Sequence, residues 1–153
     1  MAELNDYLYL GNILSRSEIE SALIKVQSDL EIVQATLEDY TETLNNPDAE
    51  TLLSPQERDS LTADLAHARE EENSLLAIEE DLSNFLEDID RSMVDPIIHE
   101  DYFQTYAEGL AADMVNMPLY YWPLSCIDWN QAVNELRQDY TALEIDGTTY
   151  YGK

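Results

Sequence analysis

The stretch that decides the fold runs from Ser17 to Asn45 and reads SEIESALIKVQSDLEIVQATLEDYTETLN. Its apolar residues are spaced alternately four and three positions apart, at Ile19, Leu23, Val26, Leu30, Val33, Leu37, Tyr40 and Leu44. This heptad spacing places them in one stripe along a helix, which is typical of a coiled-coil seam. Ser17 and Glu20 predict the capped start, and Asn45-Asn46-Pro47 predicts the end, because proline cannot continue a helix. About 29 residues at roughly 1.5 Å each give a helix about 43 Å long.

A second long helix is predicted from Pro55 up to Asp95-Pro96. Ser54 and Glu57 form a capping box around its start, with Pro55 at the first helical position. Its apolar stripe, interrupted by Glu70-Glu71-Glu72, consists of Leu61, Leu65, Ala68, Leu75, Ile78, Leu82, Leu86, Ile89 and Met93. The two helices, joined by a short loop, most simply pack as an antiparallel hairpin.

The remainder of the chain predicts a small module. A helix is expected over residues 100–114, an aromatic connector over 117–123, and another helix opening at the capping-box pattern Ser125 to Asp128. Asp146-Gly147 between two β-prone runs predicts a hairpin turn. The predicted fold is therefore mainly α: a long antiparallel coiled-coil helical hairpin followed by a small α+β module with a C-terminal β-hairpin.

We expect three parts: an N-terminal arm (residues 1–16), the acidic coiled-coil hairpin (17–95) and the α+β module (96–153). In the arm, the apolar patch from Tyr7 to Leu10 is read either as a short strand or as a packed segment.

The net charge excludes several classes of function. Among 153 residues there are 33 Asp and Glu and 7 Lys and Arg, which gives a formal net charge of −26. Direct nucleic-acid binding is excluded, because phosphate contacts need clustered Lys and Arg, and an anionic membrane surface is disfavoured. Apolar residues make up 44 %, including 10 Tyr, so a core is expected rather than a disordered acidic tail.

Motifs for chemistry are missing from the sequence. The single cysteine, Cys126, excludes an intrachain disulfide and a cysteine-based zinc site. The two histidines, His67 and His99, lie in different parts of the chain, and no EF-hand, phosphate-binding loop or nucleophile motif is present. We therefore expect no catalysis, no metal and no cofactor. An acidic start and the lack of a long apolar run indicate a cytoplasmic protein, in a host cell if the gene is mobile.

Carboxylates outside the predicted seams are the candidate partner-binding residues. They are Glu20, Asp29, Glu31, Glu38, Asp39, Glu42, Glu70, Glu71, Glu72, Glu79, Glu80, Asp81, Glu87, Asp88 and Asp90. Ordinary coiled coils alternate Glu with Lys, whereas Lys25 is the only lysine of the hairpin. Duplex DNA carries one charge per roughly 1.7 Å, so 26 charges correspond to about 44 Å of duplex, close to the length of the first helix. The pattern favours a rod that mimics DNA, although an acidic face is commonly only solvated.

Apolar residues off the seam suggest a partner as well. Ile24, Ile32, Leu76 and Phe85 leave apolar edges on which a second copy would complete a four-helix bundle, so a homodimer is expected. The alternative is that these edges pack against the α+β module of the same chain. Tyr120, Tyr121 and Trp122 are read as core residues first and as apolar anchors for a partner second.

A resemblance to a known family appears in residues 122–151. Ile127-Asp128-Trp129, Ala132, Glu135-Leu136, Asp139-Tyr140-Thr141 and Asp146-Gly147-Thr148-Thr149-Tyr150 resemble the closing segment of ArdA-type antirestriction proteins and related small phage proteins. Those proteins are acidic, dimeric DNA mimics that occupy the DNA groove of restriction-modification enzymes, although the coiled-coil hairpin departs from their elongated α/β modules. The resemblance implies a phage or mobile-element origin and a role in counter-defence.

The expected function is that of a phage or plasmid counter-defence inhibitor. It would act as an acidic DNA mimic that occludes the DNA-binding groove of a host restriction enzyme or CRISPR effector. The alternative is a coiled-coil scaffold protein of a phage or mobile element without mimicry. A third class is a chaperone that shields a basic partner.

Overall fold

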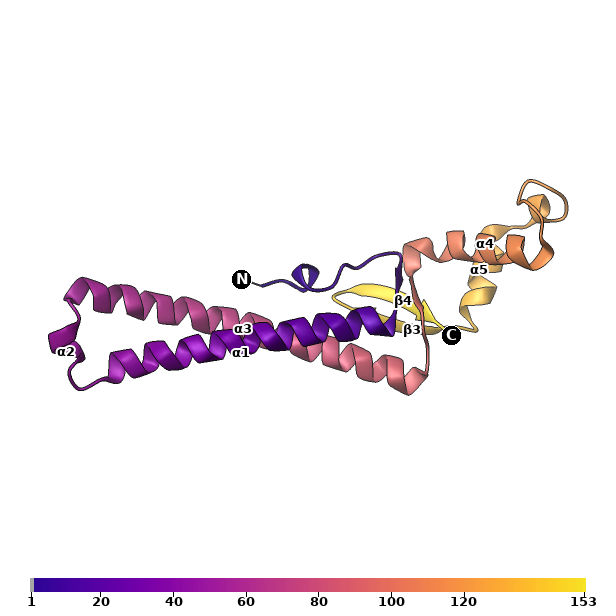
Figure 1. The fold of residues 1–153 in the computed structure, drawn as a ribbon. Helices are drawn as coiled ribbons and strands as arrows, with labels where there is room; N and C mark the ends of the chain where they lie inside the picture. The colour runs from indigo at the N-terminus through magenta and orange to yellow at the C-terminus, as the bar shows by residue number, and fades with distance from the viewer. Residues whose placement is uncertain (1) are drawn as a thin grey trace.

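Two long antiparallel helices form the body of the molecule (Figure 1). The structure, a computed structural model, describes residues 2–153 apart from the side chain of Glu50. Helix α1 (Arg16–Asn45) and helix α3 (Pro55–Ser92) pack along their length, and the short helix α2 (Ala49–Leu52) lies in the connection between them. The predicted helical hairpin followed by an α+β module is confirmed.

The ends of the two helices follow local capping chemistry. As predicted, Ser54 caps α3, and its backbone N–H donates to Glu57 Oε2 at 2.8 Å. The prediction that Ser17 caps α1 was wrong by two residues: Ser15 is the cap, and its N–H donates to Glu18 Oε2 at 2.7 Å. The sequence contains two overlapping capping boxes, and the first is used because the strand ending at Leu14 turns directly into the helix.

Met93 was wrongly predicted to belong to the seam of α3. It is the C-terminal cap of that helix, with a left-handed backbone (φ 52°), and 88 % of its surface is exposed. The residue therefore leaves the apolar stripe, because the chain turns away from the helix axis at this position.

A four-stranded antiparallel sheet joins the start, the middle and the end of the chain. Its strand order is β1-β2-β4-β3, from β1 (Ile13–Leu14), β2 (Ile97–His99), β4 (Thr148–Gly152) and β3 (Thr141–Ile145). The predicted C-terminal hairpin is present, and Asp146 and Gly147 both have positive φ, at 48° and 69°. That geometry matches the type I′ turn expected for Asp-Gly.

The N-terminal arm is a packed segment and not a strand over Tyr7 to Leu10. It begins with the 3₁₀ turn η1 (Leu4–Asp6), and Leu4 and Leu8 are buried. The extended pairing occurs later, where Ile13 and Leu14 pair with Ile98 and Ile97.

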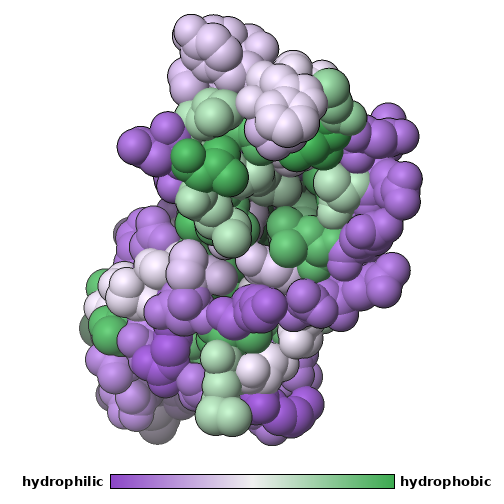
Figure 2. Space-filling model, turned by 90° about the vertical axis from the view of Figure 1, so that its right-hand side faces the viewer, coloured by the Kyte–Doolittle hydropathy of each residue, from purple (hydrophilic) through white to green (hydrophobic). Residues whose placement is uncertain are grey.

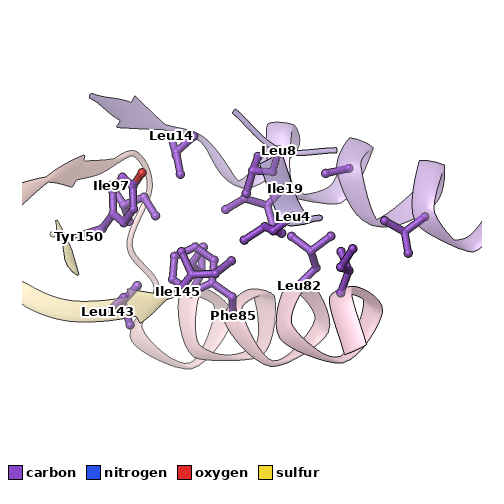
Figure 3. Close-up of a cluster of buried hydrophobic side chains, with 14 of the residues drawn as sticks. Leu4, Leu8, Leu14, Ile19, Leu82, Phe85, Ile97, Leu143, Ile145 and Tyr150 are labelled. Carbon is purple, nitrogen blue, oxygen red and sulfur yellow. The ribbon is translucent and has the colours of Figure 1, made fainter. Parts of the chain in front are cut away.

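The main core lies where one face of the sheet meets the base of the helical hairpin (Figure 3). Leu8 from the arm, Ile19 from α1 and Leu82 from α3 point into it, with Ile145 and Tyr150 from the sheet. Phe85 also lies in this core, with its ring centroid 6.4 Å from that of Tyr150. The prediction that Phe85 forms an exposed apolar edge was therefore wrong, because strand β3 packs on α3 and Tyr150 of β4 contacts the Phe85 ring.

A second, smaller core lies on the opposite face of the sheet. It contains Ile98, Phe103, Ala107 and Val133. The helices over it are α4 (Phe103–Val115), preceded by the turn η2 (Glu100–Tyr102), and α5 (Trp129–Arg137), preceded by the turn η3 (Leu124–Cys126).

The predicted cap of α5 was misplaced. Asp128 caps the helix, accepting from the Gln131 backbone N–H at 3.2 Å, whereas Ser125 lies within the preceding turn. The 3₁₀ turn uses the first residues of the capping pattern, so the helix starts three residues later.

Candidate functional site: the acidic helical hairpin

One face of the hairpin is covered by the N-terminal arm. The Tyr7 hydroxyl donates to Asp29 Oδ2 at 2.8 Å, and the Lys25 ammonium lies 3.2 Å from the Asp6 carbonyl oxygen and 4.7 Å from the centre of the Tyr7 ring. Burial, together with the hydrogen bond to Asp29, raises the pKa of Tyr7 to about 12. The carboxylates on this side are therefore partly engaged by the chain itself.

The opposite face carries an open groove between α1 and α3, which we name the acidic groove. Gln27 Nε2 donates to Glu79 Oε1 at 2.9 Å, and Gln34 Nε2 donates to Glu72 Oε1 at 3.2 Å, so two hydrogen bonds cross between the helices. Two adjoining hollows share Gln34 and form the groove. Its lining residues are Gln27, Leu30, Glu31, Gln34, Leu37, Glu38, Thr41, Glu42, Arg69, Glu72, Leu76 and Glu79.

Five of the fifteen predicted acidic residues meet in the acidic groove. They are Glu31, Glu38 and Glu42 from α1, and Glu72 and Glu79 from α3. Arg69 is the one basic residue among those that line it. Leucine side chains and carboxylates both line this groove, so it presents negative charge and is the candidate surface for a basic partner.

Four predicted acidic residues are instead neutralised by arginine. Arg16 contacts Glu20 and Asp90, with Arg16 Nε 2.7 Å from Asp90 Oδ1, and the hydrogen bond from this guanidinium holds the pKa of Asp90 below its usual range. Arg91 pairs with Glu87 at 2.7 Å and Asp88 at 3.0 Å. The Arg16–Asp90 pair joins the start of α1 to the end of α3, whereas the other three pairs lie within one helix, and we assign all of them a structural role.

The remaining six predicted residues lie on the arm side or on the outer surface. Asp29 accepts the hydrogen bond of Tyr7, and Glu71 is near enough to help raise the pKa of that tyrosine. Glu70 and Asp81 line a cavity between the arm and α3. Asp39 and Glu80 are exposed. The structure thus divides the fifteen candidates, and only one third of them share a groove.

The charge density of the hairpin can now be compared with that of DNA. Residues 16–92 contain 21 Asp and Glu and 5 Lys and Arg, a net charge of −16. Helix α3 has 38 residues, and is therefore about 57 Å long. One net charge falls on about every 3.6 Å, which is close to the 3.4 Å spacing of a single DNA strand and about half the density of a duplex. The comparison of all 26 charges with 44 Å of duplex overstated the density, because ten of these net charges lie outside the hairpin.

Tyr120, Tyr121 and Trp122 were expected to be core residues first and apolar anchors second, and the first expectation was wrong. Tyr120, Tyr121 and Trp122 are 75 %, 54 % and 76 % exposed. They lie in the loop after α4, at the end of the molecule opposite α2 (Figure 1). With Met114 and Val115, which are also exposed, they form what we call the aromatic tip. The flanking Pro118 and Pro123 could have indicated this exposure from the sequence, because prolines favour a surface turn over a buried element.

No known protein family, curated protein or solved structure matches this chain. Among residues 2–153, no helix has both the length and the apolar character that a bilayer span requires. Within the same described residues, no three His, Cys, Asp or Glu side chains gather in a way that could hold a metal ion.

Proposed function

We propose that this protein is a stoichiometric counter-defence inhibitor, encoded by a phage or plasmid, that acts as an acidic DNA mimic. The observation that carries the proposal is the acidic groove, where five carboxylates and one arginine line an open surface between two long helices. Its target is a host DNA-handling protein, either a restriction enzyme or a CRISPR effector. The resemblance of residues 122–151 to ArdA-type antirestriction proteins supports the same class of target.

The mechanism is occlusion without turnover. A basic groove that binds DNA attracts the hairpin through the same long-range field, which raises the rate of encounter. A helix about 57 Å long equals roughly 17 base pairs of duplex at 3.4 Å per pair, enough to fill such a groove. Binding displaces counterions from the target's basic groove as DNA does, so affinity should fall as salt rises.

Phage plating efficiency on isogenic hosts with individual restriction or CRISPR systems tests this proposal. Expression of the wild-type protein should rescue unmodified or targeted phage in at least one host. The variant Glu31→Gln, Glu38→Gln, Glu42→Gln should lose the rescue by more than tenfold, because it removes three charges from one rim of the groove. A matched variant on the module, Glu108→Gln, Asp113→Asn, Glu144→Gln, should retain it. Rescue that survives the groove variant but not the module variant would contradict the proposal.

A scaffold role without mimicry is the second candidate, and exposed apolar residues on α1 favour it. Ile24 and Ile32 are mostly exposed, so a partner helix could pack there. This role predicts binding that is insensitive to salt and lost in Ile24→Asp or Ile32→Asp. These positions test it better than Leu30, which is buried in the hairpin core.

A further inference from the structure

The aromatic tip is an exposed apolar feature that the proposed function does not use. Figure 2 looks straight at this end of the molecule: side chains of intermediate hydropathy project at the top, above a hollow rimmed by hydrophobic residues. The connector is held in shape by its own backbone, since the Tyr121 N–H donates to the Pro118 carbonyl at 3.1 Å and the Ser125 N–H to the Tyr121 carbonyl at 3.0 Å. Tyrosine and tryptophan side chains are enriched among interface hot spots.

The second core lies at the inner end of the helix pair, next to the sheet. The second core contains Phe103 and Ala107 from the first two turns of α4, and Val133 from α5. Farther out, Met114 and Val115 at the end of α4 are exposed, and Leu124 is the one buried residue of the connector 116–128. Met114 and Val115 therefore remain exposed at the end of α4.

We propose that a second copy of this chain packs on the aromatic tip, forming a two-fold dimer joined tip to tip. The face in Figure 2 carries both a projecting group and a hydrophobic hollow. In a two-fold arrangement the same patch faces itself, so the projection of each copy can enter the hollow of the other.

The distribution of charge favours this geometry over other dimers. Each hairpin carries a net charge of −16 and extends away from the tip (Figure 1). Contact between tips holds the two hairpins apart by much more than the Debye length of about 10 Å, so their repulsion is screened. A dimer through the hairpins would place these charges side by side. In addition, the arm covers one hairpin face and Phe85 is buried, leaving only Ile24, Ile32 and Leu76 as exposed apolar residues of the four predicted.

The exposed area also fits a second copy. Three large aromatic side chains of about 150–250 Å² each, mostly exposed, together with Met114 and Val115, offer roughly 600 Å² per copy. A standard stable interface buries about 800 Å² per partner. The area of the tip, together with that of a few neighbouring residues, is of this size.

Sedimentation equilibrium of the full chain over about 1 to 100 µM tests the proposal. The wild-type protein should approach twice the mass of one chain. The variant Tyr120→Ala, Trp122→Ala should raise the dimer dissociation constant at least tenfold, and Met114→Glu, at a separate exposed position, should do the same. Far-UV circular dichroism checks that each variant is folded. Tyr9→Ala is the matched control, because Tyr9 is an exposed aromatic residue of the arm and should leave the dimer unchanged.

The salt dependence of dimerisation distinguishes this apolar interface from an ionic one. Because two chains of charge −26 associate through apolar contacts, dimerisation should tighten as salt rises from about 50 to about 300 mM. A monomer over the whole concentration range overturns the proposal. So does a dimer that weakens with salt, or one abolished by Ile24→Asp with Leu76→Asp while the tip variants leave it intact. None of these results depends on whether the protein inhibits a defence system.

Discussion

Gly152 shows how little space the sheet leaves at its junction with α3. A Cβ added there would lie 2.7 Å from Val94 Cβ and 2.9 Å from Ile97 Cγ2, closer than such atoms can approach. We predict that Gly152→Ala lowers the free energy of unfolding by about 1–3 kcal/mol, since overpacking a core forces neighbouring side chains to move. Urea denaturation measures this.

The control for that substitution is Gly109 in α4, where an added Cβ would meet nothing within 4 Å. Gly109→Ala should raise the free energy of unfolding by up to about 1 kcal/mol, because alanine favours a helix. Equal effects at the two glycines would contradict the packing described at the junction.

Three tyrosines make stability depend on alkaline pH. Burial raises the pKa of Tyr150 to about 12, as it does for Tyr7 and Tyr140, the last helped by its hydrogen bond with Tyr106. An unfolded tyrosine has a pKa near 10, so the folded state holds these protons more tightly. The stabilisation is fully present below about pH 10 and is lost as pH rises toward about 12.

We therefore predict that the free energy of unfolding falls above pH 10, and that Tyr7→Phe makes this fall shallower. Urea denaturation between pH 8 and pH 12 measures it, with Tyr9→Phe at an exposed position as the control. A flat profile across this range would show that the three hydroxyl groups are not held as described.

The N-terminal arm acts as a structural element, although its regular structure is limited to the turn η1 and the two-residue strand β1. Leu4 and Leu8 are buried in the main core, and Tyr7 is bonded to Asp29. We predict that Leu8→Ala lowers the free energy of unfolding by about 2–4 kcal/mol, the usual range for removing a buried leucine side chain. Tyr9→Ala, next to it but exposed, should be nearly neutral. If both variants unfold at the wild-type urea concentration, the arm is not docked as the structure shows.

The sequence was sufficient to predict the hairpin because its determinants are local. Heptad spacing, the Ser54–Glu57 box and Pro47 each act within a few residues, and the structure confirms the helices that they predict. The β-hairpin was equally local, since Asp146-Gly147 is a strong turn signal. The other half of the sheet was missed, because β1 and β2 are two and three residues long and pair only through contacts such as Ile13 with Ile98, which are far apart in sequence.

The sequence predicted which acidic residues could bind a partner, but not which of them share one surface. Carboxylate positions on each helix were evident, but their neighbours depend on how the two helices face each other. Glu31 reaches the acidic groove, whereas Asp90 is paired with Arg16, 74 residues away in the sequence, so nothing local distinguishes the two carboxylates. The exposure of Trp122 was missed for a similar reason, because burial depends on where the second core ends.

At the scale of the whole molecule, charge should oppose folding. The hairpin has 21 acidic and 5 basic residues between positions 16 and 92, so like charges face one another along its helices. We predict that Glu31→Gln, Glu38→Gln, Glu42→Gln raises the free energy of unfolding by about 0.5–1.5 kcal/mol at low salt, and that added salt reduces the difference. Urea denaturation at two salt concentrations measures both effects. A groove variant that is less stable than the wild-type protein would mean that these carboxylates stabilise the fold.

A groove variant that is more stable but no longer inhibits would support the proposed function. Residues that weaken the fold but are required for inhibition point to a binding role, because stability alone would not retain them. In the two proposals the ends of the molecule have separate roles: the hairpin would present charge to a basic target, and the aromatic tip would join two copies. A dimer of this kind would present two acidic hairpins that extend in different directions.

The most direct test of the central claim is competition with DNA. Purified restriction enzymes and CRISPR effector complexes would each be bound to labelled duplex DNA, and the protein would be titrated in at low and moderate salt. We predict that it displaces the duplex from at least one of them, with one site per target and with an inhibition constant that rises steeply with salt, and that the groove variant competes at least tenfold less well. If the protein and the duplex bind the same target together, or if displacement is independent of salt, then the acidic hairpin does not act as a DNA mimic.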